Sequence, residues 1–182
     1  PEPCEYDTPK VQIAAVGPVM MKVAAEECDG VMLHAFCTGK YLQEVILPRL
    51  NKGLENSGRH REDFEISGGG FVVTGADDEA VSKMFEWVRM RVGFYGSTPA
   101  YWPVFEQHGW EELGHKLNDM SKKGRWDQMT EEISDDVVHE FCAVGRFDQI
   151  AEKIRQRFAG FVDVIAMPEN TPSDLLQEMR SF

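Results

Sequence analysis

Residues 11–34 restrict the fold of this chain more than any other segment of the sequence. They begin with an apolar run of strand length at residues 11–16, which ends at Gly17 and Pro18. Glycine permits a tight turn and proline suits the first turn of a helix, so a short helix follows until an Asp-Gly pair ends it. A second apolar run then occupies residues 31–34. Two buried strands joined by a helix require a right-handed crossover, so the segment predicts a parallel sheet with helices packed over it.

Composition excludes several classes of partner. The 182 residues include 31 acidic and 19 basic side chains, which give a formal net charge of −12. No basic stripe is present to neutralise phosphates, so we expect no nucleic-acid partner. No window approaches the roughly 18 apolar residues of a membrane span, and no basic and apolar leader opens the chain. We therefore expect a cytoplasmic protein without a membrane partner.

The cysteines are scattered, and none forms a C-x-x-C pair. Three of them lie in or beside apolar stretches, which favours buried, reduced thiols over disulfides and argues against a metal site. The four residues are Cys4, Cys28, Cys37 and Cys142.

The rest of the sequence continues the alternation of strand and helix. A third strand is expected at residues 66–74, across three successive glycines, and a fourth at residues 162–167. The expected helices cover residues 41–57 (with a kink at Pro48 and a stop at Gly58), 77–94, 113–124, 126–133, 137–142 and 145–158, and one begins at Ser173. Four parallel strands, each followed by helix, are half of what a closed (β/α)8 TIM barrel requires. We therefore predict one α/β domain over residues 1–182, about half of a TIM barrel, with an irregular lead-in at residues 1–10.

Residues 93–143 form a predicted helical insertion rich in aromatic side chains. Six aromatic residues and two prolines fall within residues 94–110, a segment longer than a simple connector. Segments of this kind cover a binding site or an interface. Five rings are candidates for a lid over a substrate, with an oligomer interface or a buried cluster as the alternative: Tyr95, Tyr101, Trp102, His108 and Trp110.

Three groups of residues together resemble the luciferase-like monooxygenase superfamily, in particular the C-terminal half of its F420-dependent oxidoreductase branch, which uses a deazaflavin coenzyme. They are residues 13–18 with the Asp-Gly entry to the second strand, residues 94–101 with residues 108–110, and Val144-Gly145 with the final helix and strand. The resemblance covers residues 9–168 and implies a (β/α)8 barrel. Family members carry four earlier βα units, which hold much of the cofactor pocket and most proposed catalytic groups. We therefore expect a fragment of a longer product or a shortened descendant. The catalytic residues are expected in the absent N-terminal half, and their identity is unknown.

The resemblance also implies which residues contact ligands. Val16 and Gly17 match positions where the family's backbone approaches the cofactor, which is coenzyme F420 or alternatively FMN. The other interpretation is a simple turn between strand and helix. His34 ends the second strand, and Thr38 and Lys40 lie in the loop that follows, so these three are candidates for substrate binding. A structural histidine and a solvated lysine that caps the next helix are the alternatives.

These inferences favour an oxidoreductase that transfers a hydride between F420 and a small organic substrate, with the protein positioning the cofactor. A non-catalytic half-barrel that binds a ligand or another chain is the alternative. An unclosed parallel sheet leaves edges and one face open, so we also expect a homo-oligomer or association with the missing N-terminal half. The acidic clusters at residues 77–79 and 135–136 stand at helix starts, where the helix dipole explains them without catalysis.

Overall fold

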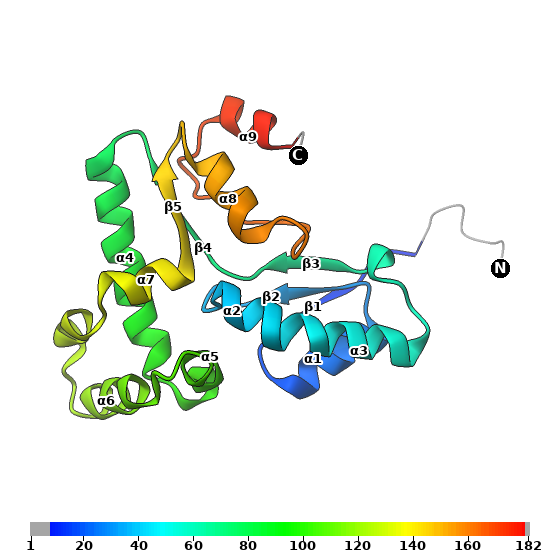
Figure 1. Ribbon diagram of the computed structural model, residues 1–182, viewed down its shortest axis with the longest axis horizontal. Coiled ribbons are helices and arrows are strands. Elements are labelled where there is room, and N and C mark those ends of the chain that lie inside the picture. Colours follow the sequence, from blue (N-terminus) through cyan, green and yellow to red (C-terminus); the bar gives the residue numbers. More distant parts are fainter. Residues whose placement is uncertain (1–7, 181–182) are drawn as a thin grey trace.

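The computed structural model describes residues 8–180 (Figure 1). The first seven residues of the expected lead-in lie outside this range, and residues 8–10 form no helix or strand. Strands β1 (Gln12–Ala15), β2 (Gly30–Leu33) and β3 (Glu65–Gly68) form a parallel sheet in that order. The parallel sheet predicted from the start of the chain is therefore confirmed.

Helices cover one face of this sheet. α1 (Pro18–Glu27) connects β1 to β2 and packs along α3 (Leu47–Ser57) on the same side of the strands (Figure 1). Val31 and Ile66 point to this side and are fully buried. Complete burial of such side chains stabilises the fold by about 1.5–3 kcal/mol each. Burial on the covered face thus stabilises the strands.

The helix predicted over residues 41–57 is present with a local change of winding. It consists of α2 (Gly39–Tyr41), a π-helical turn (Leu42–Ile46) and α3. Pro48 has no N–H to donate to the preceding turn, and the π turn lies directly before it. The expected disturbance at this proline therefore takes the form of a π turn. Gly58, at φ 67°, ends the helix as predicted.

The opposite face of the sheet is open. The strand register places Ala14 beside Met32 and Met32 beside Ser67, and an isolated bridge adds Val164 next to Ser67. Met32 is 47% exposed, and Ala14 and Val164 are exposed as well. We expected the first strand to be buried on both faces. It is covered on one face only, because α1 and α3 both lie on that face and leave the opposite one open.

The third strand was predicted as one unit and is in fact two. β3 ends at Gly68, and β4 (Phe71–Gly75) pairs with a different strand in a separate sheet. Three successive residues, Gly68, Gly69 and Gly70, have φ values of 86°, 90° and 157°, which turn the chain out of the first sheet. A Cβ atom on Gly68 would lie 2.5 Å from the carbonyl oxygen of Leu33. The prediction of one continuous strand across these glycines is therefore wrong.

The partner of β4 is β5 (Cys142–Arg146), a strand that the sequence did not reveal. The helix expected from residue 145 begins only at Ile150, as α8 (Ile150–Phe158). The fourth strand expected at residues 162–167 is reduced to a single bridge between Ser67 and Val164. The carboxylate of Asp163 accepts the N–H of Ile66 at 2.7 Å and so takes a donor that a longer ladder would need.

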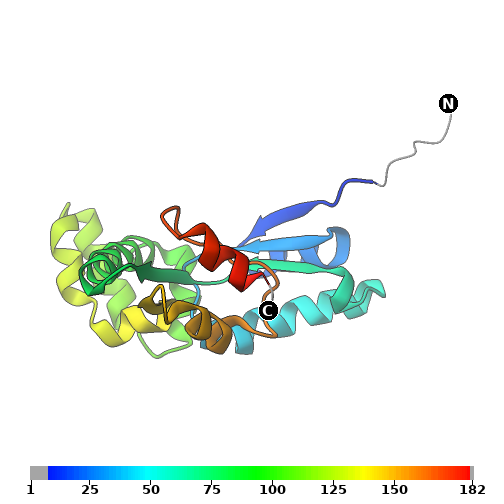
Figure 2. The same ribbon diagram turned by 90° about the horizontal axis from the view of Figure 1, so that it is seen from above.

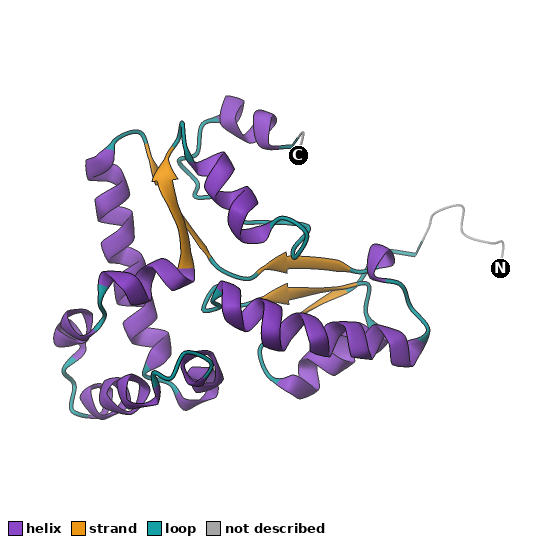
Figure 3. Ribbon diagram, in the orientation of Figure 1, coloured by secondary structure: helices purple, strands orange, loops and turns teal. Residues whose placement is uncertain are grey.

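The segment between β4 and β5 is helical (Figure 3). Its elements are α4 (Asp78–Gly96), a 3-10 turn (Pro99–Tyr101), α5 (Trp102–Glu106), α6 (Glu111–Lys122), a 3-10 helix (Trp126–Glu132) and α7 (Asp135–Phe141). A 3-10 turn (Arg61–Asp63) precedes β3, and α9 (Ser173–Met179) closes the described part of the chain. Figure 2 shows this helical body at one end of the molecule and the three-stranded sheet at the other.

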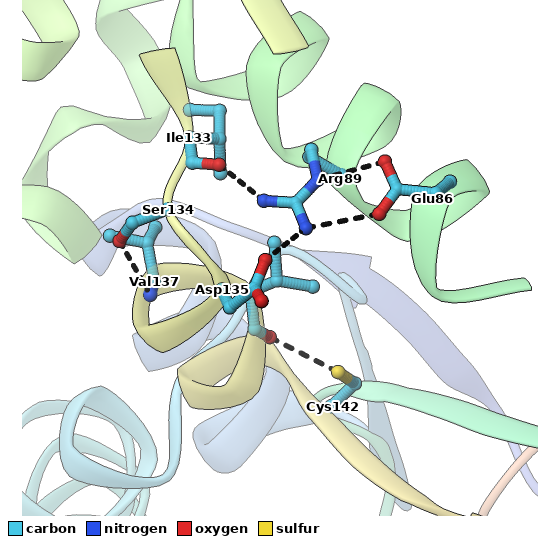
Figure 4. Close-up of polar contacts among 8 residues, drawn as sticks. Glu86, Arg89, Ile133, Ser134, Asp135, Val137 and Cys142 are labelled. Atoms are coloured by element: carbon cyan, nitrogen blue, oxygen red, sulfur yellow. Dashed lines mark hydrogen bonds and ion pairs between the residues drawn. The ribbon is translucent and has the colours of Figure 1, made fainter. Parts of the chain in front are cut away.

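The acidic residues at the helix starts have structural partners. The carboxylate of Asp77 accepts the N–H of Ala80 at 2.8 Å and caps α4. Asp135, in the first turn of α7, forms an ion pair with Arg89 of α4 (Figure 4). Arg89 also binds both carboxylate oxygens of Glu86, at 2.9 and 3.0 Å. The structural explanation offered for both clusters fits these contacts.

Cys28, Cys37 and Cys142 are buried, free thiols, and Cys4 lies outside the described residues. Burial raises the pKa of the Cys37 and Cys142 thiols to about 12, so both are protonated at neutral pH. Within residues 8–180, no helix is long and apolar enough to cross a membrane.

Candidate functional site

The candidate site lies at the carboxyl ends of β1 and β2. Val16 follows β1 and His34 follows β2, and parallel strands bring these ends to the same edge of the sheet. Both residues line a small cavity of about 20 Å³ together with Tyr101 and Val104 from the helical segment. This volume suits about one water molecule. The structure thus brings Val16 and His34 together, as the sequence predicted. Residues about 70 positions further along the chain form another wall of the same cavity.

Gly17 has no structural need to be glycine. Its φ of −86° is open to any residue, and a Cβ atom there would meet no other atom within 4 Å. Its carbonyl accepts the N–H of Met21 and begins α1. A glycine at this position leaves the backbone accessible from the open space beside the sheet edge. A positive φ would have required glycine for the turn itself, and Gly17 does not have one.

His34 is held in one tautomer. Its Nδ1 atom accepts the backbone N–H of Phe36 at 3.0 Å, so the ring proton of the neutral imidazole is on Nε2. Burial lowers the pKa of His34 from its usual value of 6.5, and the ring is therefore neutral at pH 7. Among residues 8–180, Nε2 has no hydrogen-bond partner, so it can donate to a bound molecule.

Aromatic rings continue from His34 along the helical segment. Tyr95 lies edge-on to the imidazole at 4.5 Å between ring centroids, and Tyr101 lies at 4.9 Å. Phe94 is 5.3 Å from Tyr95, and Trp126 is 6.0 Å from Phe94. We call Phe94, Tyr95, Tyr101 and Trp126 the aromatic wall. Phe94 and Trp126 are each close to half exposed, which leaves ring surface free for a partner or ligand.

Of the five rings proposed as a lid, two belong to the aromatic wall and three do not contact His34. Trp102 donates its indole N–H to the carbonyl of Gly96 at 3.0 Å. His108 stacks on Trp110 at 4.2 Å with an interplanar angle of 16°. These three rings support the helical segment. Trp126, by contrast, was missed, because it lies well outside the aromatic-rich stretch that drew attention in the sequence.

Thr38 and Lys40 hold the helical segment in place. Thr38 is 0% exposed, and its hydroxyl oxygen accepts the N–H of Tyr41 at 3.1 Å and lies 2.7 Å from Nε2 of His108. The ammonium of Lys40 donates to the carbonyl of Gln107 at 2.7 Å. The residue that caps the next helix is therefore Thr38 and not Lys40, as the alternative interpretation had it. The roles of Thr38 and Lys40 in substrate binding stay predictions. No group of acidic, histidine or cysteine side chains within the described range is arranged to bind a metal ion.

Parallel strands whose carboxyl ends meet at one edge of the sheet are a feature of α/β enzyme folds, the (β/α)8 barrels among them. A model of the luciferase-like monooxygenase family matches residues 1–163, and the chain belongs to that family. The resemblance predicted from the sequence is therefore confirmed.

The chain is similar to about half of each of several longer proteins. An uncharacterized protein of Mycobacterium tuberculosis is 44% identical over 163 residues, which is 90% of this chain and 48% of that protein. The 5,10-methylenetetrahydromethanopterin reductase of Archaeoglobus fulgidus is 29% identical over 164 residues, covering 86% of this chain and 47% of the relative. The chain thus spans about half the length of these relatives.

A solved structure confirms the fold class. The chain superimposes on the coenzyme F420-dependent tetrahydromethanopterin reductase of Methanopyrus kandleri with a TM-score of 0.70 and 24% identity, covering 92% of this chain and 47% of that structure. The α/β architecture with parallel strands therefore corresponds to about half of a TIM barrel, as predicted.

Proposed function

We propose that this chain is the C-terminal half of a (β/α)8 barrel oxidoreductase that uses coenzyme F420. Two observations support the choice of cofactor: the chain is similar to a methylenetetrahydromethanopterin reductase, and its fold matches a reductase described as F420-dependent. The bound deazaflavin would supply the chemistry, which is reversible transfer of a hydride between its ring and a carbon atom of an organic substrate.

The groups at this sheet edge suit contact with a flat, polar-edged ring system that lies outside the cavity of about 20 Å³. Gly17 leaves an open approach to the backbone between β1 and α1. His34 offers a neutral Nε2–H donor, and the aromatic wall supplies apolar ring surface that excludes water. On this proposal Val16 and Gly17 contact the cofactor, and His34 orients a substrate oxygen. The observation that carries the proposal is the convergence of an open glycine, a single-tautomer histidine and an aromatic wall at one sheet edge.

A visible-absorbance titration of the chain with F420 and, separately, with FMN tests the cofactor. We expect saturable binding of F420, and binding of FMN alone would reject F420 in favour of the alternative. The Gly17→Val variant should lose about tenfold or more in affinity, because a branched side chain would enter the space beside the ligand. Since a side chain at this position clashes with nothing, the variant should remain folded.

Lys52→Val is a matched control for the valine substitution. Lys52 is exposed on α3, which covers the other face of the sheet, so this variant should bind F420 as the unmodified chain does. Equal F420 affinity in the Gly17→Val and Lys52→Val variants would show that Gly17 does not lie at the cofactor.

A non-catalytic half-barrel that binds a ligand or another chain is the second candidate. The exposed residues on the open face of the sheet, such as Ala14 and Met32, favour it. Parallel sheets are normally covered on both faces. We therefore also propose that the open face is covered by the N-terminal half of the barrel or by a second copy of this chain. Turnover of F420 by the chain together with an N-terminal half would support the enzyme, whereas F420 binding without turnover would favour the binding module.

A further inference from the structure

A second cavity, of about 500 Å³, shares no lining residue with the small cavity beside His34, although Lys40, a candidate for substrate binding, lines it. It is bordered by the start of α2, strand β5 and helix α8, and α8 lies along β5 (Figure 1). Residues of β5 line it, and so do Lys40, Lys153 and Arg157, which have cationic side chains. No aspartate or glutamate of the described chain lines it. We call this cavity the basic pocket.

Arg157 is fixed in the wall of the basic pocket by backbone groups. Its Nη2 atom donates to the carbonyl of Glu140 at 2.6 Å and to the carbonyl of Cys37 at 3.3 Å. Its Nε atom is buried without a hydrogen-bond partner, and Nη1 has no acceptor in the part of the protein that the structure describes. Burial lowers the pKa of Arg157, but the guanidinium stays cationic at neutral pH because the pKa of an arginine side chain is ordinarily far above 7.

The charge of Arg157 has no carboxylate partner within residues 8–180. The charge of Glu140 raises the pKa of Arg157, but the contact between the two residues runs from Nη2 of Arg157 to the backbone carbonyl of Glu140 and not to its carboxylate. A half-buried cation without a counter-charge is unfavourable, because burial removes water that would otherwise stabilise it. An anion in the basic pocket would remove this cost.

Two lysines strengthen the positive field. Lys153 lies one helical turn before Arg157 on α8, and Lys40 faces it from the start of α2. The ammonium of Lys40 donates to a neutral carbonyl, and neither lysine forms an ion pair with another described residue. Three residues with cationic side chains therefore line one cavity in a protein whose net charge is −12.

We propose that the basic pocket binds a phosphorylated small molecule through its phosphate group. A fixed guanidinium and two ammonium groups suit a doubly charged phosphate, which accepts several charge-assisted hydrogen bonds. The amides of Gln43 and Gln156 provide neutral donors at the same walls. The volume lies in the usual range for small-molecule sites. The ester part of the ligand would lie against the small apolar residues of β5.

Titration of the 182-residue chain with inorganic phosphate, followed by phosphorus NMR line broadening at constant ionic strength, tests this site. We expect saturable binding that an equal concentration of chloride does not reproduce. Lys153→Glu should weaken binding by about tenfold or more, since it replaces a cation by an anion in the wall. Lys52→Glu makes the same charge change at an exposed lysine on α3 and should alter affinity by less than about twofold.

Equal loss of affinity in the two variants would reject the basic pocket, since it would show a general charge effect. Binding that does not saturate, or that chloride matches, would reject it as well. Phenyl phosphate should bind more tightly than inorganic phosphate, because its ring adds apolar contact with β5. Equal or weaker binding of phenyl phosphate would overturn the assignment of a phosphate ester as the ligand. Lys153 is exposed, so loss of binding is not confused with loss of the fold.

Discussion

Replacing Arg89 by methionine should destabilise the protein through a carbonyl group rather than through lost ion pairs. Arg89 is 8% exposed and links α4 to the start of α7 (Figure 4). One of its nitrogens donates to the backbone carbonyl of Ile133, a residue that is 2% exposed. Methionine keeps most of the apolar stem but leaves this buried carbonyl without a donor.

The magnitude follows from the exposure of each partner. A buried acceptor left unsatisfied costs about 1–3 kcal/mol. Glu86 and Asp135 carry side chains that are 57% and 74% exposed, so their ion pairs with Arg89 add about 0–1 kcal/mol. We therefore expect Arg89→Met to lower the free energy of unfolding by about 2–3 kcal/mol. For a chain of this size the melting temperature should fall by roughly 5–10 °C.

Urea unfolding followed by circular dichroism measures the change, and a double variant separates the two contributions. Glu86→Gln with Asp135→Asn removes both carboxylate charges but leaves the Ile133 carbonyl bonded, and should cost less than about 1 kcal/mol. A double variant as unstable as Arg89→Met would show that the ion pairs dominate. An Arg89→Met protein within about 0.5 kcal/mol of the unmodified chain would refute the role given to the carbonyl.

Three further predictions concern the glycine turn, the histidine and the open sheet. Gly68→Ala should cost about 3 kcal/mol or more in urea unfolding, because it combines a φ of 86° with a contact 2.5 Å from the Leu33 carbonyl. Gly58→Ala, at φ 67° with free space around it, is the control and should cost about 1–2 kcal/mol; equal costs would argue against the clash. The imidazole proton signals of His34 should titrate below pH 6.5, since burial lowers its pKa. Its contribution to stability should be complete above pH 6.5 and fall as the pH drops toward the folded-state pKa, and a midpoint above 6.5 would contradict the burial argument. Light scattering should give a mass above the 20.7 kDa of one chain, and Met32→Lys on the open face should lower it. A cooperatively unfolding monomer at micromolar concentration would show that the open face needs no cover.

Local patterns in the sequence were sufficient where one segment determines its own structure. The first strand, α1 and the second strand were all predicted, because apolar runs and the Gly17-Pro18 turn act over a few residues. The division at Gly68–Gly70 was missed, because an apolar run on both sides of the glycines reads as one strand. β5 was missed for a related reason: its five residues include alanine and glycine, show no alternation, and depend on β4 as a partner.

The candidate site divides in the same way. Val16 and His34 could be placed together, because adjacent parallel strands end at one edge of a sheet. The contacts of Thr38 and Lys40 with residues 107–108 could not be predicted, since about 70 positions of sequence separate the partners. Trp126 joins the aromatic wall through a helical packing that leaves no short-range signal.

The glycine turn after β3 also has a consequence for how such a protein can diverge. The chain leaves the first sheet at Gly68 and rejoins it at Val164, and these two residues are directly linked, N–H to carbonyl, at 2.9 Å. The residues between them therefore resemble an insertion whose two ends lie side by side. We call residues 69–163 the cassette and the three-stranded sheet with its helices the scaffold. Val16, Gly17 and His34 belong to the scaffold, whereas the aromatic wall belongs to the cassette. Mutation or recombination within the cassette can reshape one side of the site while the pairing of β1, β2 and β3 is inherited unchanged.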